Sequence, residues 1–148
     1  MLENINGDFK NKDILSLDQF STEDIGIIFR LTRKMKDIAV NARPSKFLEG
    51  KIVALIFYEP STRTFSSFSA AVKRLGGQTI EVLDPQHFSS VSKGETLADT
   101  IRVLEAYCDC IVLRHPQKGA AETAARAAFF LPVINAGDGD GEHPTQAL

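Results

Sequence analysis

Residues 52–64, with the sequence IVALIFYEPSTRT, decide the class of fold. The first six form a continuous apolar run rich in β-branched side chains, which is typical of a strand buried on both faces. Tyr58-Glu59-Pro60 ends the run, and Ser61 is then a good N-cap for a helix over 62–75 with one apolar face. A buried strand followed directly by an amphipathic helix is the building unit of parallel α/β sheets.

The rest of the chain repeats this alternation. Ser21 and Asp24 begin an amphipathic helix over 22–41 through a variant of the capping box. The pattern further predicts strands at 78–83, 110–113 and 132–135, helices at 95–107 and 120–129, polar loops at 84–94 and 114–119, a flexible Gly-rich loop at 137–141, and a new helix opening at His143-Pro144. We therefore expect an α/β protein with a parallel four-stranded sheet flanked by helices in three α/β/α layers.

Bulk composition excludes several classes of protein. The 148 residues are 43% hydrophobic and 24% charged, as in an ordinary globular domain, and the net charge is −2. Such a surface does not recruit nucleic acid or anionic membranes. No apolar run approaches the ~20 residues that span a bilayer, and the first ten residues lack a signal-peptide core, so we expect a cytoplasmic protein.

Polar residues follow each predicted strand. In chain order these are Ser61-Thr62-Arg63-Thr64, then Ser89, Ser90, Ser92 and Lys93, then Arg114-His115-Pro116, and finally the Gly-rich loop with His143-Pro144-Thr145-Gln146. Ligands of open α/β sheets sit beyond the carboxyl ends of the strands, so these groups should gather at one edge.

The segment 61–64 is the strongest candidate for an anion site. A helix start offers unpaired N–H groups and a positive dipole end, and Arg63 adds a guanidinium suited to phosphate oxygens. The alternative is a plain N-cap with a solvated arginine. The segment is neither a Walker-type loop nor a Rossmann fingerprint, because the required glycines are absent.

The remaining candidates each have a structural alternative. Arg114 ends a buried strand and needs either an internal carboxylate or a bound oxygen as partner. His143 could be a simple N-cap, with Gln146 three residues on and able to face the same side. Lys93 alone would be a solvated lysine, and His87 and His115 are expected to be surface or structural residues. No Ser-His-Asp arrangement and no metal-ligand spacing is evident, so the inventory suits a reaction that holds and polarises a phosphate ester or anhydride.

These residues, in this order, resemble the aspartate and ornithine carbamoyltransferase family over nearly the whole chain. The anchors of the resemblance are FYEPSTRT at 57–64, KGETLADT at 93–100, VLRHP at 112–116 and HPTQ at 143–146. Each is weak alone, but four in order are specific. RHP and KGETLADT are similar to the aspartate branch and differ from the ornithine branch, which is the alternative within the family.

The resemblance implies a role for each matching residue. Ser61, Thr62, Arg63 and Thr64 would bind the phosphate of carbamoyl phosphate, while Thr64, Arg114 and His143 would polarise its carbonyl oxygen. Gln146 would hold the carbamoyl amino group. Ser89 and Lys93 would reach into a neighbouring subunit's site, with Lys93 also touching L-aspartate, which implies a homotrimer with shared sites. No cofactor and no metal are implied, and regulatory chains stay an open question.

The chain departs from the family pattern in three places. Phe65 and Ser69 stand where the family usually has Arg and Glu, which we interpret as a structural ion pair replaced by apolar packing. The sequence also ends before the second domain that binds aspartate, so residues 1–148 are expected to be the carbamoyl-phosphate-binding domain, the N-terminal half of a two-domain carbamoyltransferase. Because the last predicted helix has only begun at Leu148, we expect the natural chain to continue and this piece to be inactive alone. The alternatives outside the family are a non-catalytic anion-binding module and a generic doubly wound phosphate binder.

Overall fold

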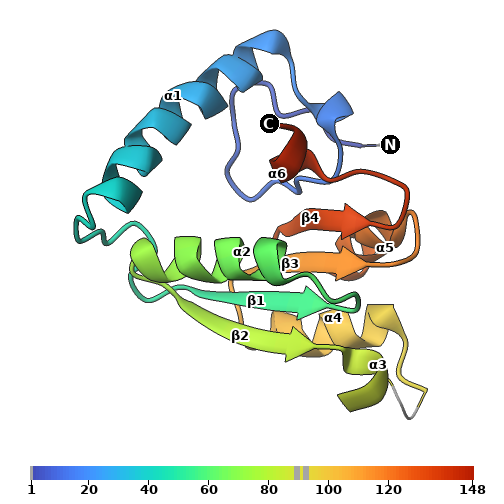
Figure 1. Cartoon of the computed structure of the whole chain (residues 1–148). Coiled ribbons are helices and arrows are strands. Elements are labelled where there is room, and N and C mark those ends of the chain that lie inside the picture. Colours follow the sequence, from blue (N-terminus) through green and yellow to red (C-terminus); the bar gives the residue numbers. More distant parts are fainter. Residues whose placement is uncertain (1, 89–90, 92–93) are drawn as a thin grey trace.

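The computed structural model describes residues 2–88, 91 and 94–148, and four parallel strands form one sheet within them. The strands lie in the order β2-β1-β3-β4 (Figure 1). Their bounds are β1 Ile52–Phe57, β2 Gln78–Leu83, β3 Cys110–His115 and β4 Val133–Asp138. The helices are the 3₁₀ turn η1 Leu17–Gln19, α1 Thr22–Val40, α2 Thr62–Arg74, α3 Pro85–Phe88, α4 Leu97–Glu105, α5 Ala120–Ala127 and α6 Pro144–Ala147.

Strand β1 is buried on both faces, as its apolar run predicts. It pairs with β2 on one side and with β3 on the other, and every residue from position 53 to position 57 is buried. Alternate side chains supply two separate cores: Ala54 and Ile56 pack toward α4 and α5, while Val53 and Leu55 pack toward α2. In Figure 1, α2 lies in front of the sheet, and α4 and α5 lie behind it. The predicted three-layer α/β/α architecture is confirmed.

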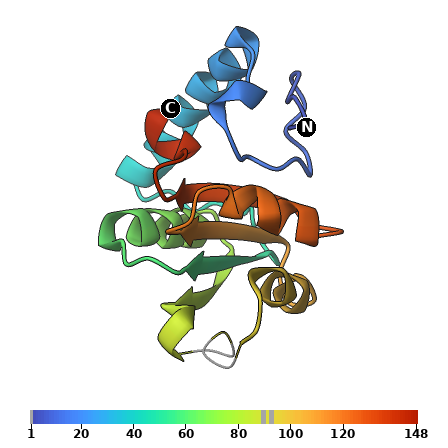
Figure 2. The same cartoon turned by 90° about the vertical axis from the view of Figure 1, so that its right-hand side faces the viewer.

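A segment before α1, residues 13–19, lies along β4 and is called the N-terminal strap below. Ile14 donates its N–H to the Val133 carbonyl (2.9 Å) and accepts from the Asn135 N–H (2.8 Å). Asp13 accepts from the Val133 N–H at 2.8 Å. The strap therefore extends the hydrogen bonding of the sheet beyond β4, and Figure 2 shows the start of the chain and α6 together on the β4 side of the sheet.

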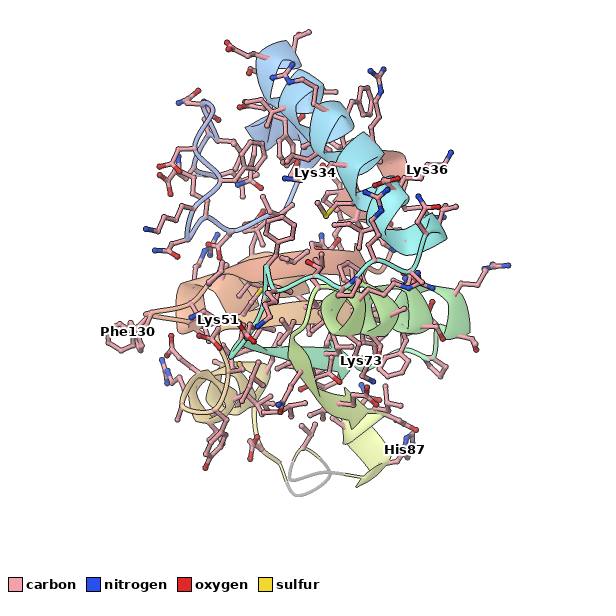
Figure 3. The ribbon with its side chains drawn as sticks, turned by 90° about the vertical axis from the view of Figure 1, so that its left-hand side faces the viewer. Lys34, Lys36, Lys51, Lys73, His87 and Phe130 are labelled. Carbon is pink, nitrogen blue, oxygen red and sulfur yellow. The ribbon has the colours of Figure 1, made fainter. Side chains whose placement is uncertain are left out.

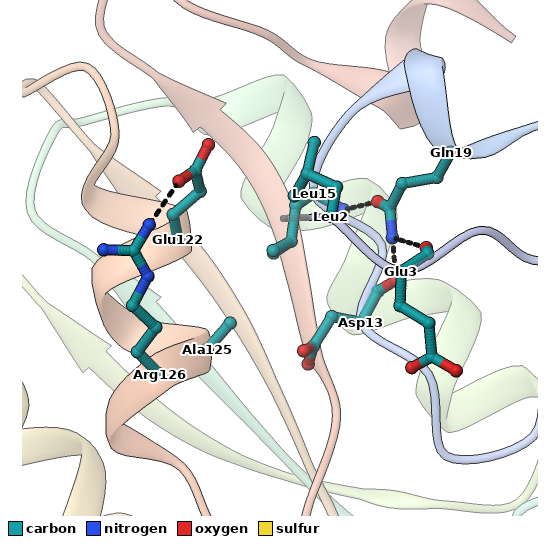
Figure 4. A pocket seen from close by; sticks show the side chains of 8 residues that line it. All are labelled: Leu2, Glu3, Asp13, Leu15, Gln19, Glu122, Ala125 and Arg126. Atoms are coloured by element: carbon teal, nitrogen blue, oxygen red, sulfur yellow. Dashed lines mark hydrogen bonds and ion pairs between the residues drawn. The ribbon is translucent and has the colours of Figure 1, made fainter.

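Gln19 ties the strap into a closed turn. Its buried Oε1 accepts from the Leu15 and Ser16 N–H groups at 2.7 and 3.1 Å. Its Nε2 donates to the carbonyls of Glu3 and Asp13 at 2.9 and 3.0 Å. Figure 4 shows this side chain beside Leu15 and Asp13, facing Glu122 and Arg126 of α5 across a hollow of about 280 Å³.

Helix α1 begins where the sequence predicts, because Ser21 accepts from the Asp24 N–H and Asp24 accepts from the Ser21 N–H. Asp24 is its one buried residue among those described, and Figure 1 shows the helix standing away from the sheet. Of the helices described, none is long and apolar enough to cross a membrane.

Several predicted boundaries need correction. The loop expected at 84–94 contains the short helix α3, and the helices expected at 95–107 and 120–129 are shorter, ending at Glu105 and Ala127. Strands β3 and β4 run two and three residues further than predicted. Gly137 and Asp138 consequently belong to a strand and not to a flexible loop.

Candidate active site

A cavity of about 390 Å³ lies at the carboxyl edge of the sheet, as expected for an open α/β fold. Residues from three separate elements meet there, namely the start of α2, the end of β3 and the segment from β4 into α6. The lining consists of Ser61, Arg63, Thr64, Ser67, Phe68, Arg114, His143, Thr145 and Gln146. Segments more than 80 positions apart in sequence therefore converge on a polar hollow.

The first turn of α2 leaves its donors open. Ser61 is the N-cap, but its side chain makes no capping hydrogen bond, whereas the N-caps Ser21 and Thr96 both accept from an N–H of the first turn. The first turn carries no acidic residue, and the Arg63 guanidinium is exposed without an ion pair to any residue the structure describes. Uncapped N–H groups, the positive end of the helix dipole and a free guanidinium together favour a bound anion.

Arg114 projects into the cavity from the end of β3 and is only partly satisfied. Its Nη2 lies 2.9 Å from Glu59 Oε2, and its Nη1 donates to the Ala136 carbonyl at 3.2 Å. Its Nε is buried and has no partner among the described residues. The sequence predicts either an internal carboxylate or a bound oxygen as the partner of this arginine. Glu59 is the internal carboxylate, and Nε can still donate to a bound oxygen.

His143 stands beside Arg114 with an equally open atom. Its buried Nε2 has no partner among the described residues, and its Nδ1 lies 3.4 Å from Thr145 Oγ1. Burial lowers the pKa of the imidazole, and the nearby positive charge of Arg114 lowers the pKa further. The ring is therefore neutral at pH 7 and can donate one hydrogen bond without adding a full charge.

A bulge in β4 brings its backbone close to these two side chains. The register with β3 shifts by one residue between Leu113 and His115, so that His115 pairs with Asp138. Gly137 lies in the bulge at φ +114°, and a Cβ there would sit 2.6 Å from Arg114 Nη1 and 3.4 Å from His143 Cδ2. The positive φ favours glycine, and a larger residue would also displace the Arg114 guanidinium.

The family follows from a comparison with known proteins. Residues 12–148 match the model of the aspartate/ornithine carbamoyltransferase, carbamoyl-P binding domain family. The chain belongs to this family. Aspartate carbamoyltransferase 1, chloroplastic, of Pisum sativum is 51% identical over 140 residues, which cover 95% of this chain and 36% of that protein. The aspartate carbamoyltransferase catalytic subunit of Methanocaldococcus jannaschii is 52% identical over 137 residues, covering 93% and 44%.

Solved structures of carbamoyltransferases carry the same fold. Aspartate transcarbamoylase from Trypanosoma cruzi in complex with carbamoyl phosphate and aspartate matches with a TM-score of 0.86 and 46% identity, over 93% of this chain and 42% of that one. The Methanocaldococcus jannaschii catalytic subunit matches with a TM-score of 0.83 and 51% identity, over 90% and 43%. The chain thus spans less than half the length of the relatives named here.

Most of the site residues expected for a carbamoyltransferase come together. Six of the seven expected to bind carbamoyl phosphate line the cavity, namely Ser61, Arg63, Thr64, Arg114, His143 and Gln146. Thr62 lines an adjacent, more apolar hollow of about 260 Å³ with Phe57 and Phe65. The predictions for Ser89 and Lys93 fall outside the described residues.

Glu59 and Gly137 are the participants that sequence reasoning missed. Glu59 lies between a strand and a proline, where the sequence indicates only a strand end, whereas the structure pairs it with Arg114. Gly137 lies in a run of alternating Gly and Asp that is typical of a flexible loop, and no local signal marks its contact with a side chain 23 positions earlier.

The two departures from the family pattern have different surroundings. Phe65 packs edge-on against Phe57, with ring centroids 5.5 Å apart, in agreement with the predicted apolar packing. Ser69 is buried in a polar network instead: it accepts from Lys73 Nζ at 2.8 Å and donates to Glu81 Oε1 at 3.2 Å. Apolar packing therefore replaces only the first member of the supposed pair, and the prediction for position 69 is wrong.

Proposed function

We propose that the full-length protein containing this chain is an aspartate carbamoyltransferase, and that this domain holds carbamoyl phosphate. The observation that carries the proposal is the convergence of Arg63, Arg114 and His143, from three distant segments, on one cavity. The relatives named above as aspartate carbamoyltransferases support the choice of aspartate as acceptor, and so does the sequence Arg114-His115-Pro116.

The cavity offers distinct places for the two ends of carbamoyl phosphate. The phosphate suits the open first turn of α2, where backbone N–H groups, the Ser61 hydroxyl and Arg63 can all donate. The carbonyl oxygen suits Arg114 Nε and His143 Nε2, which are both buried and have no hydrogen-bond partner among the residues that the structure describes. A bound oxygen there would satisfy atoms that are otherwise costly to bury.

This placement favours the transition state of carbamoyl transfer. The aspartate amine attacks the carbonyl carbon, negative charge grows on the carbonyl oxygen, and the C–O bond to phosphate breaks. The proton that the amine loses is taken up by the departing phosphate. Arg114 and His143 would stabilise the growing charge, because fixed donors in a partly buried site act most strongly where charge develops. Arg63 would stabilise the departing phosphate. The residues at this cavity act through donation and positive charge, without a covalent enzyme intermediate.

Further parts of the proposal concern the assembled protein. We propose that it is a homotrimer in which Ser89 and Lys93 serve the neighbouring subunit's site, that it is cytoplasmic, and that its reaction belongs to pyrimidine biosynthesis. The binding of L-aspartate would require the part of the protein that lies beyond this domain. The homotrimer and the pathway rest on the family resemblance of the sequence, whereas the cytoplasmic location rests on the expectation from sequence composition given above.

The proposal is tested by product formation from the full-length protein. Carbamoyl phosphate is supplied with either L-aspartate or L-ornithine, and the products are separated and quantified. We expect N-carbamoyl-L-aspartate from the first reaction and no citrulline from the second. Citrulline formation would instead indicate the ornithine branch, and the absence of both products, with carbamoyl phosphate still bound in calorimetry, would indicate a non-catalytic anion-binding module.

A further inference from the structure

The orientation of His143 depends on the turn that precedes it. This turn, residues 138–142, leads from the end of β4 to the N-cap of α6, where His143 sits. The contacts of the imidazole are local, namely a 3.4 Å approach to Thr145 Oγ1 and an interaction with the His143 backbone, and its buried Nε2 has no partner among the described residues. Its position therefore has to be fixed through the backbone of the turn.

Asp138 holds the turn from within. This carboxylate is 7% exposed and accepts three hydrogen bonds. Oδ2 accepts from the Gly119 N–H at 2.9 Å, and Oδ1 accepts from the Glu142 N–H at 2.8 Å and from Asn135 Nδ2 at 3.3 Å. The end of β4, the start of α5 and the residue before His143 are thereby joined through one side chain. Hydrogen bonds to an ionised acceptor are about twice as strong as neutral ones, so this joint is stiff.

Glu142 holds the same turn from outside, through the N-terminal strap. Its Oε1 accepts from Ser16 Oγ at 2.7 Å, and its Oε2 accepts from the Leu17 N–H at 2.8 Å. These contacts join positions 125 and 126 residues apart. The strap is itself closed by Gln19 and hydrogen-bonded to β4, so Glu142 is anchored to an ordered segment and not to a free terminus.

We propose that Asp138 and Glu142 are positioning residues for His143, fixing the 138–142 turn so that the imidazole faces Arg114 in the cavity. This inference rests on the proposed function, because it assigns these carboxylates to the carbonyl side of the carbamoyltransferase site. Neither residue lines the cavity, so they act through the backbone and not through contact with the substrate. A misplacement of about 1 Å at a reacting group can cost on the order of 100-fold in rate, which makes such support a functional feature.

The first test uses Asp138→Asn in the full-length enzyme. Both carboxylate oxygens accept from N–H groups, so an amide nitrogen at either position opposes a donor and shifts the turn. We expect kcat to fall about tenfold to 100-fold per folded molecule, measured well below the melting temperature. The Kd for inorganic phosphate, which binds at the start of α2, should stay within about twofold, because that part of the site is untouched. If Asp138 had a purely structural role, the variant would have a lower melting temperature, but kcat would not fall while the Kd for phosphate stays the same.

Asp140→Asn is the matched control. Asp140 lies in the same turn and is exposed, so the same chemical change there should leave kcat, phosphate affinity and melting temperature as in the wild type. The inference is overturned if folded Asp138→Asn enzyme has the kcat of this control. An equal loss of kcat and of phosphate affinity would also overturn it, since that would mean a general collapse of the cavity.

Glu142→Gln is a second variant that tests the inference even if Asp138→Asn does not fold. Its side chain lies nearer the surface, and we expect kcat to fall by about threefold or more, with the His143 ring resonances displaced in NMR spectra recorded with inorganic phosphate. Unchanged kcat and unchanged His143 resonances in this variant would overturn the inference. The His143 resonances report on the position of the ring even if the protein is not catalytic. If the wild-type protein forms no product but the His143 resonances shift in both variants, the proposed function is refuted and the positioning role is still supported.

Discussion

Arg114 illustrates how one residue serves the fold and the site together. A guanidinium at the end of a buried strand is costly without partners, and Glu59 and the Ala136 carbonyl satisfy two of its nitrogens. The third, Nε, is buried and has no hydrogen-bond partner within the described part of the chain. Gly137 is what allows the close packing, since any Cβ there would collide with Nη1. The side chain is thus held in place before a substrate arrives, which is the condition for strong electrostatic stabilisation.

The titration of His143 gives a prediction at the same scale. Burial and Arg114 both disfavour the imidazolium, so we expect a pKa below 6.5 in the ligand-free enzyme, measured by NMR titration of the ring carbons. Inorganic phosphate should raise this pKa, because a nearby dianion favours the charged ring. Arg114→Gln should raise it also, because a positive neighbour is removed. A ligand-free pKa at or above 6.5 that does not change with phosphate or with Arg114→Gln would contradict this interpretation of the site.

At the scale of elements, α2 differs from α1 and α4 in how it starts. Ser21 and Thr96 cap their own helices through side-chain hydrogen bonds, whereas Ser61 occupies the same position on α2 without one. A serine that does not stabilise its own helix is available to bind a ligand. The difference separates a structural cap from a binding residue at positions that look equivalent in the sequence.

Ser61→Ala and Thr96→Ala form a matched pair that tests this difference. Thr96→Ala should lower the free energy of unfolding by about 1 kcal/mol through loss of the cap. Ser61→Ala should change it by less than about 0.5 kcal/mol. In calorimetry, the same Ser61→Ala variant should bind inorganic phosphate roughly tenfold more weakly, since a hydrogen bond to a charged group contributes about 1.5 kcal/mol or more. If the two variants lose the same free energy of unfolding and Ser61→Ala keeps its phosphate affinity, Ser61 is an ordinary helix cap and not a binding residue.

The replacement of the usual Arg by Phe65 gives a second prediction for α2. Phe65→Arg removes an edge-on aromatic contact with Phe57 and places a charge at a half-buried position against the core on that face of the sheet. We expect the free energy of unfolding to fall by about 1–3 kcal/mol, measured by denaturant titration. Ser66→Arg, at an exposed position one residue on, is the control and should be nearly neutral. An unchanged stability of Phe65→Arg would show that the site tolerates the family residue.

Sequence reasoning succeeded where the signal is local. The apolar run of β1 and the capping box of α1 are each contained in a few residues, and the structure confirms them. Ser61 occupies the predicted N-cap position of α2 but makes no side-chain cap hydrogen bond. The pairing of the N-terminal strap with β4 was not predictable in this way, because Asp13 and Val133 are 120 positions apart. The bulge at Gly137 and the burial of Asp138 were missed for a similar reason. Their run of glycines and aspartates is typical of a loop, and only tertiary contacts make it a strand end.

The same division applies to the candidate site. Parallel strands bring their carboxyl ends to one edge, so the meeting of Arg63, Arg114 and His143 followed from topology. The sequence did not predict which nitrogen atoms of Arg114 already have partners, because those partners, Glu59 and the Ala136 carbonyl, are known only from the structure. Thr62 lies toward the neighbouring hollow, an orientation that alternation along a sequence does not reveal.

At the scale of the whole molecule, the described residues form one sheet with its site at one end and exposed apolar side chains elsewhere. Phe130 is 90% exposed, and Figure 3 shows it extending from the same side of the molecule as Lys51. The cavity lining holds two arginines and one histidine, which suits one phosphate and one carbonyl oxygen.

This arrangement predicts the behaviour of the 148-residue chain produced alone. We expect it to bind carbamoyl phosphate weakly, if at all, and to form no N-carbamoyl-L-aspartate, because the proposed function assigns the binding of L-aspartate to the rest of the full-length protein. The full-length protein assayed in parallel is the control. Turnover by the isolated chain would mean that this domain carries a complete site.

The most direct measurement is a crystal structure of the full-length protein with N-(phosphonacetyl)-L-aspartate, the compound bound in one of the Trypanosoma cruzi structures that this chain resembles. We predict that the phosphonate lies within hydrogen-bond distance of the first turn of α2 and of Arg63. The acetyl carbonyl oxygen should lie within reach of Arg114 Nε and His143 Nε2. A phosphonate bound elsewhere, with these three side chains turned away from it, would contradict the assignment of the site.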